Sequence, residues 1–123
     1  MAAKVLVVDD SRTIRQQVGT VLVQAGYQVV EAEDGMQGLT AVGAQRDIVL
    51  VICDINMPNM NGIEMLAAVK ENAANAALPV VMLTTEGKAQ LIQQAKRYGA
   101  KGWIVKPFKP DQLVAVVRKI VGD

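Results

Sequence analysis

The sequence contains no histidine and a single cysteine, Cys53, among its 123 residues. Zinc sites and nucleophile–histidine sites depend on these residue types, so their near-absence excludes nearly all such chemistry. One cysteine also excludes an internal disulfide and fits the cytosol. Because Cys53 lies inside an apolar run, we interpret it as a buried packing residue.

Long hydrophobic runs are also missing, although 51% of the residues are hydrophobic. The longest apolar stretches are about six residues, far short of the ~20 that span a bilayer, so we expect no membrane segment. The first acidic residue, Asp9, comes too early for a secretory signal. Length and composition together predict one compact cytoplasmic domain covering residues 1–123.

Charge is balanced overall but unevenly placed along the chain. The net charge is +1, yet residues 1–86 hold five basic and ten acidic side chains, and residues 87–123 hold eight basic and two acidic ones. A solvated helical face would explain this distribution, and so would a basic surface for a protein partner. The excess is too small to indicate nucleic acid, so we expect no direct nucleic-acid binding.

Apolar runs and helical patterns alternate along the chain, which is typical of α/β proteins. Runs such as VLVV and IVLVIC have no polar alternation, as expected for strands buried on both faces of a parallel sheet. The five predicted strands cover residues 4–9, 28–32, 48–53, 79–84 and 102–105. The five predicted helices, with the caps Ser11 and Asp34 included, cover about 11–25, 34–44, 63–73, 88–98 and 110–121.

Right-handed crossovers turn these units into a flavodoxin-like, doubly wound α/β fold, with a five-stranded parallel sheet and five helices on its two faces. We predict the strand order 2-1-3-4-5, in which the first and third strands flank the crevice where ligands bind. Asp9 and Asp10 end the first strand and Asp54 ends the third. Thr84 and Lys106 end the fourth and fifth strands, so all five side chains should share one edge of the sheet.

Carboxylates that crowd together repel one another, which is more typical of a functional site than of a structural device. Three carboxylates without His or Cys favour a hard cation such as Mg²⁺. An aspartate is also a competent nucleophile toward phosphorus, and Thr84 and Lys106 offer a hydroxyl and an ammonium to phosphoryl oxygens. Taken singly, each residue has an ordinary explanation, such as helix capping by Asp10; the joint arrangement favours phosphoryl chemistry.

Four segments, VLVVDDSR, DINMPNMNG, MLTTE and VKPF, resemble those of response-regulator receiver domains, and the resemblance covers the whole chain. It implies that Asp54 is the phosphoacceptor, assisted by Thr84 and Lys106. It also implies a cis peptide bond between Lys106 and Pro107.

The same resemblance implies a magnesium site. Asp10 and Asp54 would hold Mg²⁺ together with the backbone carbonyl of Asn56, and Asp9 would act mainly through water.

The GWIVKPF segment and the short chain resemble chemotaxis-type regulators that consist of a receiver domain alone. This similarity implies a sensor histidine kinase as phosphodonor and a target protein whose affinity changes on phosphorylation. It further implies a monomer or a weak phosphorylation-dependent dimer. Catalysis would be limited to the protein's own phosphotransfer and dephosphorylation, so we do not expect an enzyme.

Trp103 stands where members of this family often carry Tyr or Phe as a ring that changes rotamer on activation. We interpret Trp103 as either such a switch or a residue of simple surface packing. Apolar side chains cover most of the circumference of the last predicted helix, so some should face solvent or a partner. We expect the fourth helix, fifth strand and last helix, including Val116 and Lys119, to bind an acidic, amphipathic target segment or a second copy of this protein.

Two other functions fit the same chemistry or fold. A small Mg²⁺-dependent phosphohydrolase that forms an aspartyl phosphate would need a substrate-covering cap, and no inserted segment is long enough for one. A flavodoxin-like electron carrier would need aromatic residues against its flavin, and only 3% of the residues are aromatic. Sustained turnover of phosphate esters would support the first, and a coloured purified protein would support the second.

Overall fold

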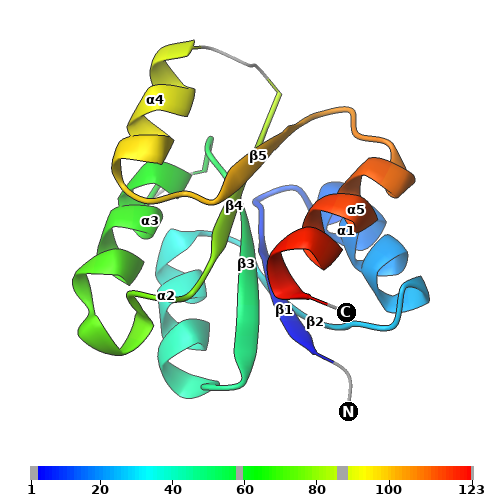
Figure 1. Ribbon diagram of the computed structural model, residues 1–123, viewed down its shortest axis with the longest axis horizontal. Helices are drawn as coiled ribbons and strands as arrows, with labels where there is room; N and C mark the ends of the chain where they lie inside the picture. The colour runs from blue at the N-terminus through cyan, green and yellow to red at the C-terminus, as the bar shows by residue number, and fades with distance from the viewer. Residues whose placement is uncertain (1–2, 58–59, 86–88, 123) are drawn as a thin grey trace.

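The computed structural model describes residues 3–57, 60–85 and 89–122, and over these ranges strands and helices alternate (Figure 1). The strands are β1 (Lys4–Val8), β2 (Gln28–Ala32), β3 (Ile48–Asp54), β4 (Val80–Thr84) and β5 (Gly102–Val105). The helices are α1 (Arg12–Gln24), α2 (Gly35–Ala44), α3 (Gly62–Glu71), α4 (Ala89–Arg97) and α5 (Pro110–Val121), with a 3₁₀ turn η1 (Ala73–Asn75). None of the helices in these ranges combines the length and apolar character that crossing a membrane requires.

The strands form one parallel sheet in the order β2-β1-β3-β4-β5, which confirms the predicted fold. Helices α1 and α5 cover one face, and α2, α3 and α4 cover the other (Figure 1). Val8 of β1 pairs with Cys53 of β3, so the residues that follow them leave the sheet side by side. The carboxyl ends of β1 and β3 therefore meet at the point where the chain changes direction across the sheet.

Side-chain caps begin the helices that follow the first three strands. The Ser11 hydroxyl accepts a hydrogen bond from Ile14 N–H at the start of α1, and Asp34 caps α2 through Gln37 N–H. Asn61 and Glu64 form a reciprocal capping box at the start of α3. These caps satisfy backbone N–H groups that have no partner within a helix.

The third helix is shorter than predicted. We expected it to reach about residue 73, but α3 ends at Glu71. Asn72 leaves helical geometry, and its side chain accepts a hydrogen bond from Ala74 N–H, which starts the separate turn η1. An Asn side chain competes in this way with the helical backbone, so it favours a new turn over continuation. The predicted start of the fourth helix, residue 88, lies outside the described residues.

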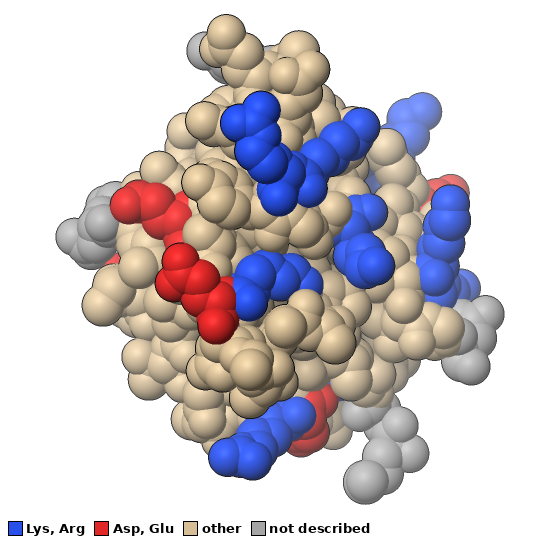
Figure 2. Space-filling view, turned by 60° about the vertical axis from the view of Figure 1, so that its left-hand side comes forward, with Lys and Arg blue, Asp and Glu red and all other residues tan. Residues whose placement is uncertain are grey.

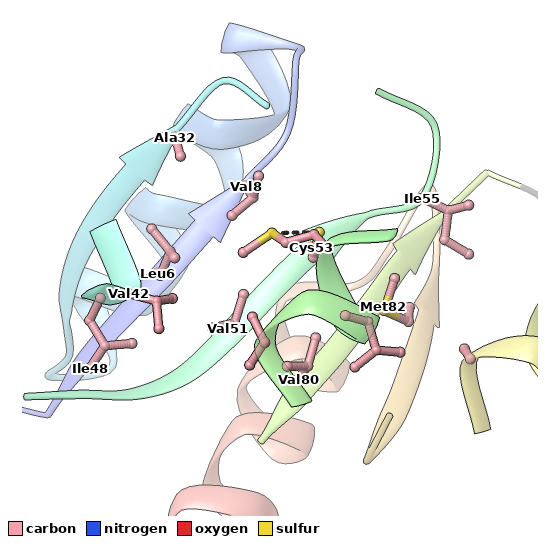
Figure 3. Close-up of a cluster of buried hydrophobic side chains, with 14 residues drawn as sticks. Leu6, Val8, Ala32, Val42, Ile48, Val51, Cys53, Ile55, Val80 and Met82 are labelled. Carbon is pink, nitrogen blue, oxygen red and sulfur yellow. Dashed lines mark hydrogen bonds between the residues drawn. The ribbon is translucent and has the colours of Figure 1, made fainter. Parts of the chain in front are cut away.

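Each face of the sheet has its own hydrophobic core, because successive side chains of a strand point to opposite faces. The first core lies beneath α2, α3 and α4 and includes Leu6, Val51 and Met82 (Figure 3). The second core lies beneath α1 and α5. Cys53 is fully buried in the first core with its Sγ 3.6 Å from Met65 Sδ, which confirms that it is a packing residue. Burial raises the pKa of the Cys53 thiol.

Gly62 lets α3 begin directly against the end of β3. A Cβ atom at this position would lie 2.2 Å from the main-chain oxygen of Asp54. The Gly62 N–H donates a hydrogen bond of 2.9 Å to the Ile55 carbonyl, which holds the helix start against the strand end. A side chain here would displace the backbone that carries Asp54.

Gly62→Ala is therefore expected to lower the free energy of unfolding by about 2 kcal/mol or more, because backbone atoms cannot move aside as a flexible side chain can. The matched control is Gly43→Ala in α2, where an added Cβ meets no atom within 4 Å. Alanine loses less backbone conformational entropy on folding than glycine does, so the control should raise the free energy of unfolding by about 0.5–1 kcal/mol. Urea unfolding measures both changes, and equal effects at the two positions would contradict the packing argument.

Candidate functional site

Three carboxylates converge at the carboxyl edge of the sheet. Asp9 and Asp54 are 0% and 4% exposed, and Asp10 is exposed. One oxygen from each carboxylate lies within 4.8 Å of the other two. The strand order explains this proximity, because Asp9 follows β1 and Asp54 ends the neighbouring β3.

Lys106 supplies a positive charge to this cluster from the segment that follows β5. Its Nζ lies 2.9 Å from Asp9 Oδ2 and 3.4 Å from Asp54 Oδ1. Its backbone N–H donates a hydrogen bond of 2.7 Å to the Thr84 carbonyl, which holds the segment after β5 against the end of β4. The peptide bond from Lys106 to Pro107 is cis, as the resemblance implied.

The acidic cluster changes the titration of Asp54. Burial, followed by the negative charge of Asp9, raises the pKa of Asp54 to about 6. Lys106 and a hydrogen bond from the Asn56 backbone act in the opposite direction and only partly offset these effects. The metal-free site therefore keeps uncompensated negative charge, which a cation would relieve.

The donor set fits a magnesium ion. Mg²⁺ prefers oxygen ligands, and each of the three carboxylates offers one oxygen that lies within 4.8 Å of the other two. Asp9 already accepts hydrogen bonds at both carboxylate oxygens, from Ser11 N–H at 2.8 Å and from Lys106 at 2.9 Å. Asp10 and Asp54 are thus better suited than Asp9 to bind the ion directly. The carbonyl of the exposed Asn56, two residues after Asp54, is a further oxygen ligand near the site.

Thr84 and Trp103 lie on the neighbouring strands β4 and β5. Thr84 is buried at the end of β4 and pairs with Val105. Trp103 is half-buried against the first core, and Lys96 Nζ lies 4.9 Å from the centroid of its ring. The ring thus packs on the α4 side of the sheet.

The two residues that we expected on the surface of α5 differ in exposure. Lys119 is exposed, whereas Val116 is half-buried and packs against the second core. Leu113 and Val117 are fully buried, and Ile120 and Val121 also pack against this core. Most of the apolar surface of α5 is thus used inside the molecule, so a substitution at Val116 would affect packing as well as a surface.

Sequence reasoning missed Arg15, a buried cation beside the site. Its Nη1 donates a hydrogen bond of 2.5 Å to the Asp9 main-chain oxygen, and its Nε donates one of 3.1 Å to Glu31. A signal was present in the sequence, because Arg15, Val18 and Leu22 follow helical spacing and form the buried stripe of α1. A charged residue inside an apolar stripe is seldom buried without a specific partner.

Asp54→Asn is expected to raise the free energy of unfolding of the metal-free protein by about 1–2 kcal/mol near neutral pH. The folded-state pKa of Asp54, about 6, exceeds the ordinary value of 3.8, so ionisation of Asp54 costs stability above about pH 6. The cost shrinks as the pH falls from about 6 to about 4 and is absent once both states are protonated.

Urea unfolding with a chelator present, repeated across this pH range, measures the change. The control is Asp47→Asn at the opposite end of the sheet, where a hydrogen bond from Lys4 lowers the pKa of Asp47. This control should lose a little stability at neutral pH. If Asp54→Asn raised the free energy of unfolding equally at about pH 4 and at neutral pH, the electrostatic explanation would be contradicted.

Comparison with known proteins agrees with this geometry. The sequence profile named "Response regulator receiver domain" matches residues 5–118. "Chemotaxis protein CheY1" of Helicobacter pylori is 37% identical over 120 residues, with 97% of each chain covered. A "Chemotaxis protein CheY homolog" of Campylobacter jejuni is 36% identical, with 97% of this chain and 92% of the relative covered. The structure of Vibrio cholerae chemotaxis protein CheY4 superposes with a TM-score of 0.92 at 42% identity, covering 98% of this chain and 99% of that chain.

The profile match spans β1 to α5, and the relatives align over almost their full lengths. Three of the segments that carry the resemblance contribute the side chains of Asp9, Asp10, Asp54 and Lys106 that meet at the carboxyl edge of the sheet, and the fourth contributes Thr84 at the end of β4. This chain therefore belongs to the response regulator receiver domain family, whose members are phosphorylatable signalling proteins of two-component systems.

Proposed function

We propose that this protein is a receiver domain over residues 1–123 that accepts a phosphoryl group from a histidine kinase on Asp54. Phosphorylation then changes its affinity for a target protein. The observation that carries the proposal is the placement of Asp54 beside Asp9 and Asp10, with Lys106 3.4 Å away, at the ligand-binding edge of the sheet. The names of the relatives support a role in chemotaxis or motility.

In the proposed transfer, an oxygen of the Asp54 carboxylate attacks the phosphorus of a phosphorylated imidazole. The new P–O bond forms as the P–N bond breaks, and the imidazole nitrogen keeps the electron pair of that bond. The chemistry needs an ionised Asp54, and the nearby Lys106 favours this form. Lys106 and the Thr84 hydroxyl would bind oxygens of the transferred group.

Mg²⁺ held by Asp10, Asp54 and the Asn56 carbonyl would neutralise the phosphoryl oxygens during in-line transfer. Asp9 would act indirectly, because its buried carboxylate holds Lys106 next to Asp54. The protein would thus catalyse only its own phosphorylation and dephosphorylation.

Asp54→Asn should abolish Mg²⁺-dependent labelling by a small acyl phosphate, because the amide is not a nucleophile toward phosphorus. Intact-protein mass spectrometry detects the label. Asp10→Asn keeps the acceptor and should need a much higher Mg²⁺ concentration for the same labelling. Asp111→Asn, on the exposed start of α5, is the control and should label as the wild type does. Full labelling of Asp54→Asn, or sustained turnover of phosphate esters by the wild type, would contradict the proposal.

We further propose that the target protein binds to the face formed by α4, β5 and α5. Tyr98 and Val105 expose 47% and 41% of their surface there. The face seen in Figure 2 carries more basic than acidic side chains, and Lys96, Lys101 and Lys119 are exposed on or beside these elements. Apolar groups among basic ones suit an acidic, amphipathic segment. Trp103 would act as the switch, since it lies on β5 beneath Lys96.

Val105→Ser combined with Lys119→Glu should weaken binding of the partners that co-purify with the protein in the presence of an acyl-phosphate mimic. Labelling of Asp54 should remain, because neither side chain contributes to the acidic cluster. Phosphorylation should also change Trp103 fluorescence. Val23→Ser is the control, since Val23 is 59% exposed on α1, a helix that is not part of the α4–β5–α5 face. Normal partner binding by the double variant would place the interface on another face.

A further inference from the structure

All three oxygens of Asp9 are held by different donors. Oδ1 accepts from Ser11 N–H at 2.8 Å, Oδ2 accepts from Lys106 at 2.9 Å, and the main-chain oxygen accepts from Arg15 Nη1 at 2.5 Å. Arg15 is the least expected of these donors, because it is only 7% exposed and carries a full charge. A buried guanidinium is costly unless it makes strong hydrogen bonds, so its partners show what it does.

The bond to the Asp9 carbonyl is the buried one among the contacts of Arg15. Its other partners are Glu31 at 3.1 Å and Glu33 at 4.0 Å, whose side chains are 50% and 67% exposed. Exposed ion pairs contribute little to the stability of the fold, whereas a buried charge-assisted hydrogen bond contributes more. The function of Arg15 should therefore be sought at the Asp9 carbonyl.

That carbonyl lies where the chain leaves β1. The Asp9 N–H still donates to the Ala32 carbonyl of β2 at 3.1 Å, as in a strand, but the Asp9 carbonyl binds Arg15 instead of a strand neighbour. The carbonyl belongs to the planar peptide unit that joins Asp9 to Asp10. Holding its oxygen therefore fixes the plane of that peptide and the direction in which the Asp10 side chain leaves the backbone.

We propose that Arg15 is a positioning residue that aims Asp10 at the metal site through the Asp9–Asp10 peptide. The inference rests on the proposed function only in taking Asp10 and Asp54 as ligands of a divalent cation. Glu31 orients the guanidinium from its exposed side and has a smaller effect. Arg15 itself binds neither the ion nor the phosphoryl group.

Charge and geometry predict opposite results when Arg15 is removed. Loss of a positive charge near an acidic cluster should tighten the binding of a divalent cation. Loss of the bond to the Asp9 carbonyl should loosen the turn and weaken the same binding. The sign of the change in Mg²⁺ affinity therefore separates a positioning role from a purely electrostatic one.

The experiment measures the Mg²⁺ dissociation constant by titration calorimetry, at a temperature where circular dichroism shows each variant to be folded. Arg15→Met should bind Mg²⁺ about tenfold more weakly, as expected when a group that orients a ligand is lost. Arg15→Lys keeps a cation that can bond the carbonyl and should recover part of the affinity. Glu31→Gln leaves the bond to the carbonyl and should stay within about twofold of the wild type.

The matched control is Lys70→Met. Lys70, in the last turn of α3, also donates to main-chain carbonyls, those of Ala76 and Leu78 at 3.1 and 2.7 Å, but these carbonyls lie on the segment before β4, away from the acidic cluster. It should lose stability without any change in Mg²⁺ affinity. A second readout is amide exchange of Ser11 in the metal-free protein, which should be faster in Arg15→Met and unchanged in Lys70→Met.

Unchanged or tighter Mg²⁺ binding by Arg15→Met would overturn the inference, and so would an equal loss in Glu31→Gln. If Arg15→Met does not fold, Arg15→Gln takes its place with the same expectations. Phosphorylation is not part of these measurements. A wild-type protein that binds Mg²⁺ but takes no label would thus refute the proposed function while leaving the role of Arg15 open to the same test.

Discussion

Lys106 determines whether the acidic cluster can exist in its observed form. Two buried carboxylates a few ångströms apart would otherwise have to share a proton, and removal of one partner from a buried ion pair typically costs about 3–5 kcal/mol. The Nζ atom of Lys106 contacts the carboxylates of both Asp9 and Asp54. Asp9 and Lys106 follow β1 and β5, and Asp54 ends β3. The contact therefore requires the order β1-β3-β4-β5 and the hydrogen bond that holds the segment after β5 against β4.

Lys106 does not fully compensate the negative charge of the carboxylates at this edge of the sheet, and the remaining negative charge favours the binding of a cation. Lys106 lowers the cost of the cluster without removing it, and the pKa of Asp54 remains raised to about 6. The site is therefore prepared for an additional cation, and its buried oxygens are already fixed by Ser11, Lys106 and Arg15. Preorganised donors of this kind need not rearrange when charge develops during a reaction.

The position of the cluster also supports the proposed transmission to the α4–β5–α5 face. Thr84 pairs with Val105, and Met82, two residues earlier on β4, pairs with Trp103. In the proposed mechanism, a change at the end of β4 would act on β5, the neighbouring strand that carries Trp103 and the exposed Val105. Met82 belongs to the first core and Trp103 packs against it, so any displacement of these side chains would have to preserve the packing of that core.

Local sequence patterns determined the strands, most helix boundaries and the set of residues at the carboxyl edge. Strands buried on both faces have a distinctive apolar composition, and the handedness of crossovers restricts the order in which they can pair. The same reasoning placed Asp9, Asp10, Asp54, Thr84 and Lys106 at one edge. It gave α3 two residues too many, because the competition between the Asn72 side chain and the helical backbone is decided by a single hydrogen bond.

Only the tertiary structure decided which of these side chains touch. Asp9 and Lys106 are 97 residues apart in the chain, and their contact depends on distances between elements that no local pattern records. The partner of Arg15 is also decided by the tertiary structure, because every residue has a main-chain carbonyl and the sequence does not show which one Arg15 binds. The same holds for Val116, because α5 has apolar residues on several sides and only packing shows which of them face the core. Sequence periodicity is a short-range property, whereas burial and ion pairing arise from the packing of whole elements against one another.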